Sequence, residues 1–433
     1  MFGIKLALLK LTIFIGKLCG KGSSFPGMLA NKINFNFKDI NIADKKIIYV
    51  IGTNGKTTTT NFIYQLLKNN NINVITNHEG ANLETGIKTL ILKHTKFNHH
   101  LDCDTILLEV DEKTIKHITN ILPPQYVVVT NFFRDQLDRY GEIDLIVEEI
   151  KQQLINYQPQ MFLNGNDPYI YYQFNDFTNK HYYGLTIDNI NNLAASRKVE
   201  NYQKVRDMVY CPICKQPLTY DYFHYGHLGS FSCHNCNINP KIEYQLVETP
   251  NGFVIDNQSY QIDNLPLYFL FNIISSVSII GYLDLSIASL EQLIKEFKFP
   301  PGRNQTTTYN NTPVYVNLVK NVVGFEETID YVTNNFDQYK LIICLNDNYA
   351  DGKDISWIYD VNVDQLLKQA TTITTSGLRA YDMALRLELS TNQPIDVIED
   401  INRCLITTIN GPQQVVVISN YTALPQVLNT INK

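Results

Sequence analysis

A run of glycine, lysine and threonine near the start of the chain has the residue types needed to bind phosphate. The run consists of Gly52, Thr53, Asn54, Gly55, Lys56, Thr57 and Thr58. Glycines let backbone N–H groups approach phosphate oxygens, and a following helix adds the positive end of its dipole. Lys56 would reach the β- and γ-phosphates, and the Thr57 hydroxyl would bind Mg²⁺. The strict P-loop spacing requires glycine where Val50 stands, so an ordinary glycine turn is the alternative.

A carboxylate at the end of a predicted strand could complete a magnesium site. Glu109 lies near the end of the apolar stretch 105–110, and Asp111 and Glu112 follow it. Carboxyl ends of parallel strands face the ligand crevice in α/β sheets. We therefore expect Glu109 to bind Mg²⁺, and the alternative is a solvated charge at the end of a strand.

Four cysteines have the spacing of a zinc site. Cys211 and Cys214 form one CxxC pair, and Cys233 and Cys236 form a second pair after a gap of 18 residues. Two such pairs place four thiolates at the corners of a tetrahedron, which suits Zn²⁺. Cysteine takes all four positions, so we expect a structural zinc with no open position for water. The pattern indicates a metal in a reducing compartment rather than a disulfide framework.

An acidic loop follows a predicted strand in the last third of the chain. It contains Asp347, Asp351 and Asp354. An EF-hand calcium loop is excluded because its third and twelfth positions would be Tyr349 and Ile358. A solvated turn rich in aspartate and glycine is the alternative to a functional loop.

The elements that must position these residues alternate between apolar strands and helical patterns. Strands are expected over 45–52, 72–77, 105–110 and 126–131, with a helix over 57–70. Strands separated by helices predict an α/β fold with a parallel, doubly wound sheet. Beyond the Pro/Gly-marked boundary at Phe299–Asn304, a second, smaller α/β domain is expected, with strands over 313–319, 339–346, 371–377 and 413–420.

Three parts of the chain follow from this pattern. We expect an N-terminal helical segment (1–44), a central ATP-binding domain (45–300) and a C-terminal domain (301–433). A module rich in Cys, Tyr, His and Gly, at about 205–245, interrupts the central domain as a zinc-ribbon insertion.

Composition limits the class of protein. The chain has 433 residues, of which 44% are hydrophobic and 18% charged, with a net charge of -6. This balance is typical of a globular protein and excludes general disorder. No basic excess exists to hold a polyanion, so we expect no nucleic-acid partner.

Two apolar segments could be mistaken for membrane spans. Lysines interrupt Met1–Gly20, and no cleavage site follows it, so an amphipathic helix on the protein or near a membrane surface is favoured over a signal peptide. Leu267–Leu283 is at the lower limit for a span and contains Asn272, so we expect a helix buried in the core. We expect no transmembrane segment, and a cytoplasmic protein that can lie at the inner face of the membrane.

The loop GTNGKTTT resembles the ATP-binding loop of Mur ligases and folylpolyglutamate synthases, which join a carboxylate to an amine through an acyl phosphate. Other stretches narrow the resemblance over almost the whole chain to the MurT family, the Mur-ligase-like subunits of lipid II isoglutaminyl synthase. They are NHEGAN, TNFFRDQLDRYGEID, LNGNDP, the CxxC pairs, PPGRNQ and NDNYADGKDISWIYD.

The resemblance implies a glutamine-dependent carbon–nitrogen ligase of peptidoglycan synthesis. ATP would be used to amidate the α-carboxyl of D-glutamate in the lipid II stem peptide, giving D-isoglutamine. The seven loop residues match the family's nucleotide loop and Glu109 matches its Mg²⁺-binding glutamate. Asn272 falls where Mur enzymes place an adenine-contacting asparagine, and Arg303 where they place a nucleotide-contacting arginine.

The source of ammonia is expected to be another polypeptide. Release of ammonia from glutamine requires a cysteine nucleophile with a histidine base. None of the remaining cysteines lies in a nucleophile elbow: Cys19, Cys103, Cys344 and Cys404. The resemblance implies a GatD-type glutaminase partner whose triad is completed in trans by Asp354, with Asp347 and Asp351 as other candidates. The predicted catalytic residues are thus Lys56, Glu109 and Asp354.

The sequence also departs from the Mur ligases. Where they carry Asp-His-Leu-Asp, this chain has Asp135, Gln136, Leu137 and Asp138. Ile150, with Lys151 beside it, stands near the position of their carbamylated lysine, so we expect no carbamate. Two rival hypotheses are an autonomous amino-acid ligase of the Mur or folylpolyglutamate type, and a non-catalytic scaffold that only binds ATP.

Overall fold

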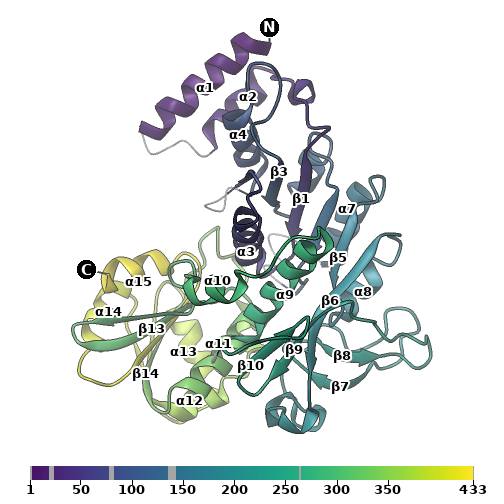
Figure 1. Ribbon diagram of the computed structural model, residues 1–433. Helices are drawn as coiled ribbons and strands as arrows, with labels where there is room; N and C mark the ends of the chain where they lie inside the picture. The colour runs from purple at the N-terminus through teal and green to yellow at the C-terminus, as the bar shows by residue number, and fades with distance from the viewer. Residues whose placement is uncertain (1, 19–23, 78–81, 135–142, 263–264, 433) are drawn as a thin grey trace.

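The computed structural model describes residues 2–18, 24–77, 82–134, 143–262 and 265–432 (Figure 1). Two large sheets organise the chain, and a small two-stranded sheet lies in an insertion.

The larger sheet has nine strands in the order β11-β10-β9-β6-β5-β4-β1-β3-β2. Their bounds are β1 (Lys46–Ile51), β2 (Val74–Thr76), β3 (Thr105–Glu109), β4 (Tyr126–Val129), β5 (Gln160–Asn164), β6 (Lys180–Ile187), β9 (Tyr244–Thr249), β10 (Gly252–Ile255) and β11 (Gln258–Tyr260). Neighbouring strands from β9 to β2 in this order pair in parallel. β10 pairs antiparallel with both β9 and β11.

Helices cover both faces of this sheet. One face carries α1 (Phe2–Leu18), α2 (Phe25–Lys32), α4 (Glu84–His94), α5 (Ile115–Ile118), α7 (Ile143–Leu154) and α8 (Pro168–Gln173). The other carries α3 (Lys56–Asn69), α9 (Leu267–Tyr282) and α10 (Leu290–Glu296). Along β1, Tyr49 belongs to the first core and Val50 to the second. Alternate side chains enter opposite layers, so the strand is apolar throughout.

The second sheet has six strands in the order β12-β13-β17-β14-β15-β16. Its elements are β12 (Gln305–Tyr309), β13 (Thr312–Leu318), β14 (Tyr339–Cys344), β15 (Ala370–Ser376), β16 (Ile395–Val397) and β17 (Val415–Ser419). On one face lie α11 (Val322–Asn335), α12 (Asp364–Gln369) and α13 (Ala380–Glu388), and on the other α14 (Ile401–Thr408) and α15 (Leu424–Ile431).

A long insertion separates β6 from its parallel neighbour β9. It spans 188–243 and contains β7 (Thr219–Phe223), β8 (Gly229–Ser232) and three single-turn helices, η3 (Ile190–Asn192), η4 (Ala195–Arg197) and η5 (Val199–Asn201). The limits of the zinc-ribbon module within it, at about 205–245, stay a prediction. Two further turns are η1 (Phe37–Asp39) and η6 (Ser356–Tyr359).

The predicted α/β class, with a parallel doubly wound sheet and a second α/β domain, is confirmed. The apolar stretch near residue 270 forms α9, whose residues from Phe269 to Ile280 are buried. Within the described ranges, every helix is too short or too polar to cross a bilayer. The domain limits 1–44, 45–300 and 301–433 stay predictions.

Candidate active site

The phosphate-binding loop predicted from the sequence connects β1 to α3. Gly52 and Gly55 have φ values of 128° and 85°, which L side chains rarely adopt. A Cβ on Gly55 would lie 2.3 Å from Oδ1 of Asn272, and one on Gly52 would lie 2.3 Å from Oγ1 of Thr130. Glycine is therefore required at both positions, by backbone conformation and by the close approach of these side chains.

Lys56, the first residue of α3, lies between a carbonyl and a carboxylate. Its Nζ donates to the Gly52 carbonyl and forms an ion pair with Oε1 of Glu112 at 2.8 Å. Burial by itself would lower the pKa of Lys56, but Glu112, with Glu109 and Asp111 nearby, raises it above its usual value. The ammonium is therefore retained and can neutralise phosphate.

Glu109 lies at the end of β3, directly beside the end of β1, where it is paired with Val50. Asn77 fixes its backbone, donating from Nδ2 to the Glu109 carbonyl (2.7 Å) and accepting from the Glu109 N–H (2.9 Å). Asn82 Nδ2 donates to Glu109 Oε1 at 3.2 Å. The buried carboxylate and the Thr57 hydroxyl at the start of α3 are hard oxygen donors, which fit Mg²⁺ chemically.

A cleft beside the loop contains both predicted nucleotide-contacting residues. Asn272 and Arg303 line it together with Asn54, Gly55 and Thr58. The cleft encloses about 800 Å³, part of it open to solvent. Apolar and amide walls next to a glycine loop suit a nucleotide base and ribose.

The second sheet contributes two polar residues to the same place. Just after β13, Lys320 Nζ donates to the Thr53 carbonyl at 3.2 Å. Asn321 Nδ2 donates to Asn54 Oδ1 at 3.4 Å. Lys320 also lines the pocket that contains Lys56 and Glu112, so two lysines line one pocket beside the loop.

The three aspartates of the acidic loop have different surroundings. Asp351 is buried, and its carboxylate accepts hydrogen bonds from the N–H and hydroxyl of Thr422. Asp347 forms ion pairs with Arg379 (2.9 Å) and Lys353 (3.4 Å). Asp354 is exposed and has no basic partner among the described residues.

The pKa of Asp354 is lowered by its hydrogen bonds from Ser356, whose N–H lies 2.9 Å from Oδ1. Its carboxylate therefore stays ionised and accessible. It also lines a second pocket together with Lys320 and the ion pair formed by Arg134 and Asp207.

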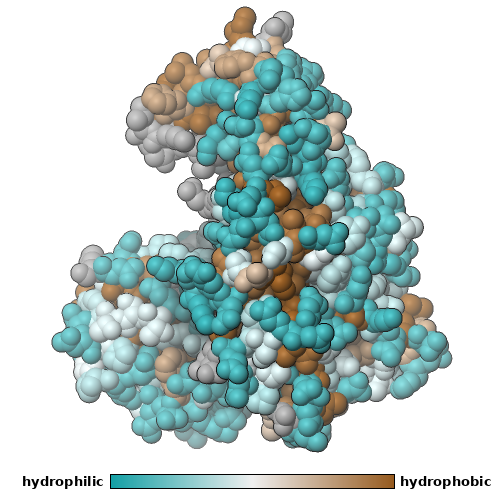
Figure 2. All heavy atoms as spheres, in the orientation of Figure 1, coloured by the Kyte–Doolittle hydropathy of each residue, from teal (hydrophilic) through white to brown (hydrophobic). Residues whose placement is uncertain are grey.

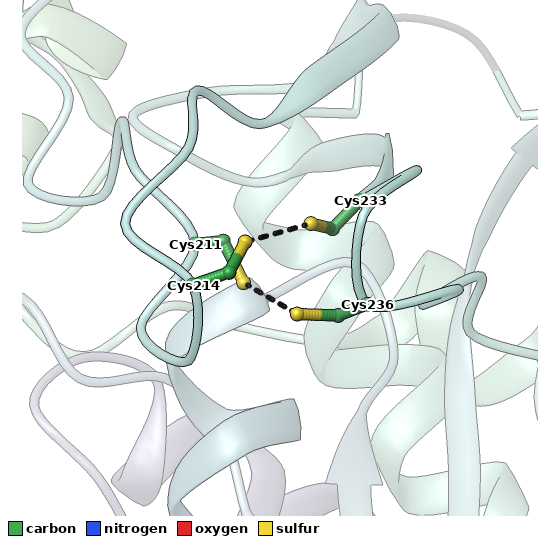
Figure 3. Close-up of side chains that lie close together, drawn as sticks. All are labelled: Cys211, Cys214, Cys233 and Cys236. Atoms are coloured by element: carbon green, nitrogen blue, oxygen red, sulfur yellow. Dashed lines mark hydrogen bonds between the residues drawn. The ribbon is translucent and has the colours of Figure 1, made fainter.

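The four cysteines of the insertion converge on one point (Figure 3). Sγ of Cys211 and Sγ of Cys236 are 3.8 Å apart, and those of Cys214 and Cys233 are 3.5 Å apart. All four sulfurs lie within 4.8 Å of one another. A tetrahedron with Zn–S bonds of about 2.3 Å has edges of about 3.8 Å, so the cluster can hold a metal ion of this size.

Histidines of the insertion have other partners. His227 Nε2 lies 3.2 Å from Asp167 Oδ1, and His224 Nδ1 lies 2.9 Å from Nη2 of Arg197. Asn166 donates to the Gly229 carbonyl at 3.2 Å, and a Cβ on Gly226 would touch the Phe133 ring. The insertion therefore packs on the loops that follow β4 and β5.

Comparison with known proteins assigns this arrangement to a family. The model of the Mur ligase middle domain matches residues 50–237, and that of the MurT ligase C-terminal region matches 318–424. The subunit MurT of lipid II isoglutaminyl synthase (glutamine-hydrolyzing) from Staphylococcus aureus strain COL is 30% identical over 420 residues, which cover 95% of this chain and 93% of that protein.

The chain belongs to the MurT family. The MurT subunit from Streptococcus pneumoniae is also 30% identical, over 95% of this chain and 92% of its own. Among solved structures, a pseudomurein peptide ligase type C from Methanothermus fervidus has a TM-score of 0.70 at 17% identity and covers 93% of this chain and 80% of its own. That likeness confirms the Mur-ligase-like fold.

Sequence reasoning about this MurT-family chain missed Lys320 and Asn321. No local motif marks them, because they reach the loop only through docking of the second sheet. Asp135, Asp138 and Cys19 lie outside the described residues. Ile150 is in the core, and Lys151 pairs with Asp176 at 3.3 Å.

Proposed function

We propose that this chain is the synthetase subunit of a lipid II isoglutaminyl synthase. It would amidate the α-carboxyl of D-glutamate in the lipid II stem peptide, using ATP and ammonia from a glutaminase subunit. Similarity to MurT subunits over 95% of the chain supports the substrate and reaction class. The observation that carries the chemistry is that Lys320 lines both the cleft beside the phosphate-binding loop and the adjoining pocket that contains Lys56.

ATP would occupy the cleft with its base near Asn272 and Arg303. Its phosphates would lie along Gly52–Thr58, where Lys56 exchanges the Glu112 carboxylate for phosphate oxygens. Thr57 and Glu109 would hold Mg²⁺. When bound, Mg²⁺ would neutralise charge on the transferring phosphoryl group.

The reaction would proceed in two steps. The substrate carboxylate attacks the γ-phosphorus and ADP leaves, giving an acyl phosphate. Ammonia then attacks the carbonyl carbon, inorganic phosphate leaves, and the nitrogen loses a proton. Lys56 and Lys320 would stabilise the negative charge carried by the phosphoryl oxygens.

A GatD-type glutaminase would dock beside the acidic loop and supply ammonia. Asp354 is the candidate for its triad because the carboxylates of Asp347 and Asp351 already have internal partners. A carboxylate there would hold the partner's histidine in the correct tautomer. Tyr349 in the loop is exposed, as are Leu378 and Tyr381 on either side of Arg379, the partner of Asp347, and they supply apolar surface for such a contact.

The zinc ion would be structural, because four cysteines leave no position for substrate. Its module would brace the loops that carry Phe133 and Asn166.

Oxygen-isotope transfer tests the acyl phosphate. Lipid II with a heavy-oxygen label in the D-glutamate α-carboxyl is incubated with the chain, MgATP and ammonium. One labelled oxygen should appear in inorganic phosphate for each amide formed. Amidation with unlabelled phosphate would contradict the proposal. Coupling to a free amino acid instead of ammonia would favour the autonomous ligase, and no turnover even with the glutaminase would favour the scaffold.

A further inference from the structure

The outer face of α1 is apolar and exposed. Ile4, Leu8, Leu11 and Ile15 recur at helical spacing on one face, and Phe14 lies beside them. Ile4 is 80% exposed, Phe14 62% and Leu11 54%. Figure 2 shows hydrophobic side chains gathered over this helix at one end of the molecule. Apolar surface concentrated in this way marks a contact site.

The opposite face of the same helix is fixed to the protein. Leu6, Leu9 and Ile13 are buried in the core that α2 and α4 complete. Lys5 Nζ donates to the carbonyls of Ile33 and Asn34, at 2.8 and 3.0 Å. The helix is therefore anchored in one orientation, with its second apolar face exposed.

The charge around α1 is one-sided. Residues 1–38 contain six lysines and no aspartate or glutamate, although the whole chain has a net charge of -6. On α2, which packs against α1, Phe25 and Met28 are also exposed. An apolar face flanked by lysines is complementary to the acyl–headgroup boundary of an anionic bilayer.

Two other occupants fit less well. A second copy of the chain packed on this face would bring Lys5 and Lys10 of one copy towards those of the other, which electrostatic repulsion opposes. A glutaminase at the acidic loop would be distant, because α1 lies at the opposite end of the molecule from α12 and α13 (Figure 1).

We propose that the outer face of α1 lies in the interface of an anionic phospholipid bilayer. The inserted residues are Leu8, Leu11, Phe14 and Ile15. Lys5 and Lys10 border this face and keep their charge while their ammonium groups donate to backbone carbonyls of the protein. Binding would be peripheral, since α1 does not span a bilayer. Its purpose rests on the proposed function: it would hold the synthetase where the lipid-linked stem peptide lies.

Vesicle sedimentation of the full chain tests the inference. Vesicles of phosphatidylglycerol and phosphatidylcholine are compared with vesicles of phosphatidylcholine alone. The wild type should sediment with the anionic vesicles, and Leu11→Gln combined with Phe14→Gln should weaken that binding about tenfold or more. Ile406→Gln is the matched control, because Ile406 on α14 is 59% exposed and should not affect binding.

Activity separates this inference from the proposed function. With ammonium and MgATP, the α1 variant should amidate a detergent-free, short-chain lipid II analogue as the wild type does, but lose activity on vesicle-embedded lipid II. If the wild type amidates lipid II but does not bind anionic vesicles, the membrane inference is overturned and the proposed function is not. Vesicle binding without any amidation would overturn the proposed function alone. If the wild type instead forms a dimer in analytical ultracentrifugation that depends on Leu11, and does not bind vesicles, the occupant is a second copy of the chain. That result would overturn the proposal of a bilayer.

Discussion

In the proposed mechanism, nucleotide binding depends most directly on Lys56. Its ammonium lies between the Gly52 carbonyl and the Glu112 carboxylate, and nearby acidic groups keep its pKa high. An incoming phosphate would therefore replace one oxyanion with another rather than meet a bare, desolvated lysine. The positive charge is present before the ligand arrives, so it can stabilise phosphate oxygens once Lys56 exchanges partners.

Removal of Lys56 should abolish ATP turnover. In Lys56→Ala, the phosphoryl group loses its ammonium, and the rate of ADP formation should fall by about a hundredfold or more. The control is Lys68→Ala, because Lys68 is exposed at the far end of the same helix. ADP release is measured with lipid II and ammonium. Amidation retained at the wild-type rate in Lys56→Ala would remove the loop from the mechanism.

Asp354 should matter for one nitrogen source only. Asp354→Asn removes the carboxylate that would orient the partner's histidine, so glutamine-driven amidation should fall by about a hundredfold or more. Activity with free ammonium should remain near the wild-type rate.

Asp360→Asn is the control for this substitution, since Asp360 is exposed in the same loop region. Amide formation is measured with each nitrogen source. Equal loss from both sources in Asp354→Asn would place Asp354 in the ATP site or in the structure of the loop instead.

At the scale of elements, features marked by a contiguous sequence pattern could be predicted. Contacts between segments far apart in the sequence could not. The strand, glycine loop and helix around Lys56 were predicted because their pattern is contiguous. The pairing of CxxC motifs likewise predicted a cluster that the structure assembles. The three aspartates could not be separated by spacing, because Arg379 and Thr422, which engage Asp347 and Asp351, come from distant segments. Lys320 was missed for the same reason.

The zinc module is expected to brace the site rather than act in it. Cys233→Ser, or chelation of the metal, should lower the thermal midpoint by several degrees, because metal binding and local folding are coupled. Amidation from glutamine and from ammonium should fall in the same proportion.

Zinc content, measured by elemental analysis, should be one ion per wild-type chain and should be retained in Cys103→Ala, which changes a buried cysteine outside the cluster. If Cys233→Ser lost activity but kept both its zinc and its thermal midpoint, the module would not have a bracing role.

At the scale of the whole molecule, the insertion also contacts the second α/β unit. Lys204 forms ion pairs with Glu327 (2.9 Å) and Asp330 on α11, and the Val205 N–H donates to Glu326 at 3.4 Å. Glu326 Oε2 is buried without a partner in the described structure. Because α11 follows Lys320 and Asn321 directly, this contact helps fix the second sheet over the phosphate-binding loop.

The contribution of Glu326 to the free energy of unfolding should fall as pH rises. Burial raises the pKa of Glu326 to about 7 from 4.5, against the opposing effect of Lys204. A raised pKa in the folded state means that its stabilising contribution is full below pH 4.5 and is lost as pH rises through 7. In urea denaturation, the wild type should lose about 2 kcal/mol more than Glu326→Gln over that range.

The exposed Glu388→Gln should follow the wild-type pH profile, since it changes a glutamate of the same unit that lies outside the contact. A Glu326→Gln profile parallel to that of the wild type would show that the carboxylate does not change protonation on unfolding.

The central claim is that this polypeptide activates a carboxyl group while another polypeptide supplies the nitrogen. The most direct test gives the purified chain lipid II and MgATP without a glutaminase, and offers either ammonium or glutamine. Amide formation should occur with ammonium and be absent with glutamine until the glutaminase is added. Amidation from glutamine by the chain alone would contradict the account.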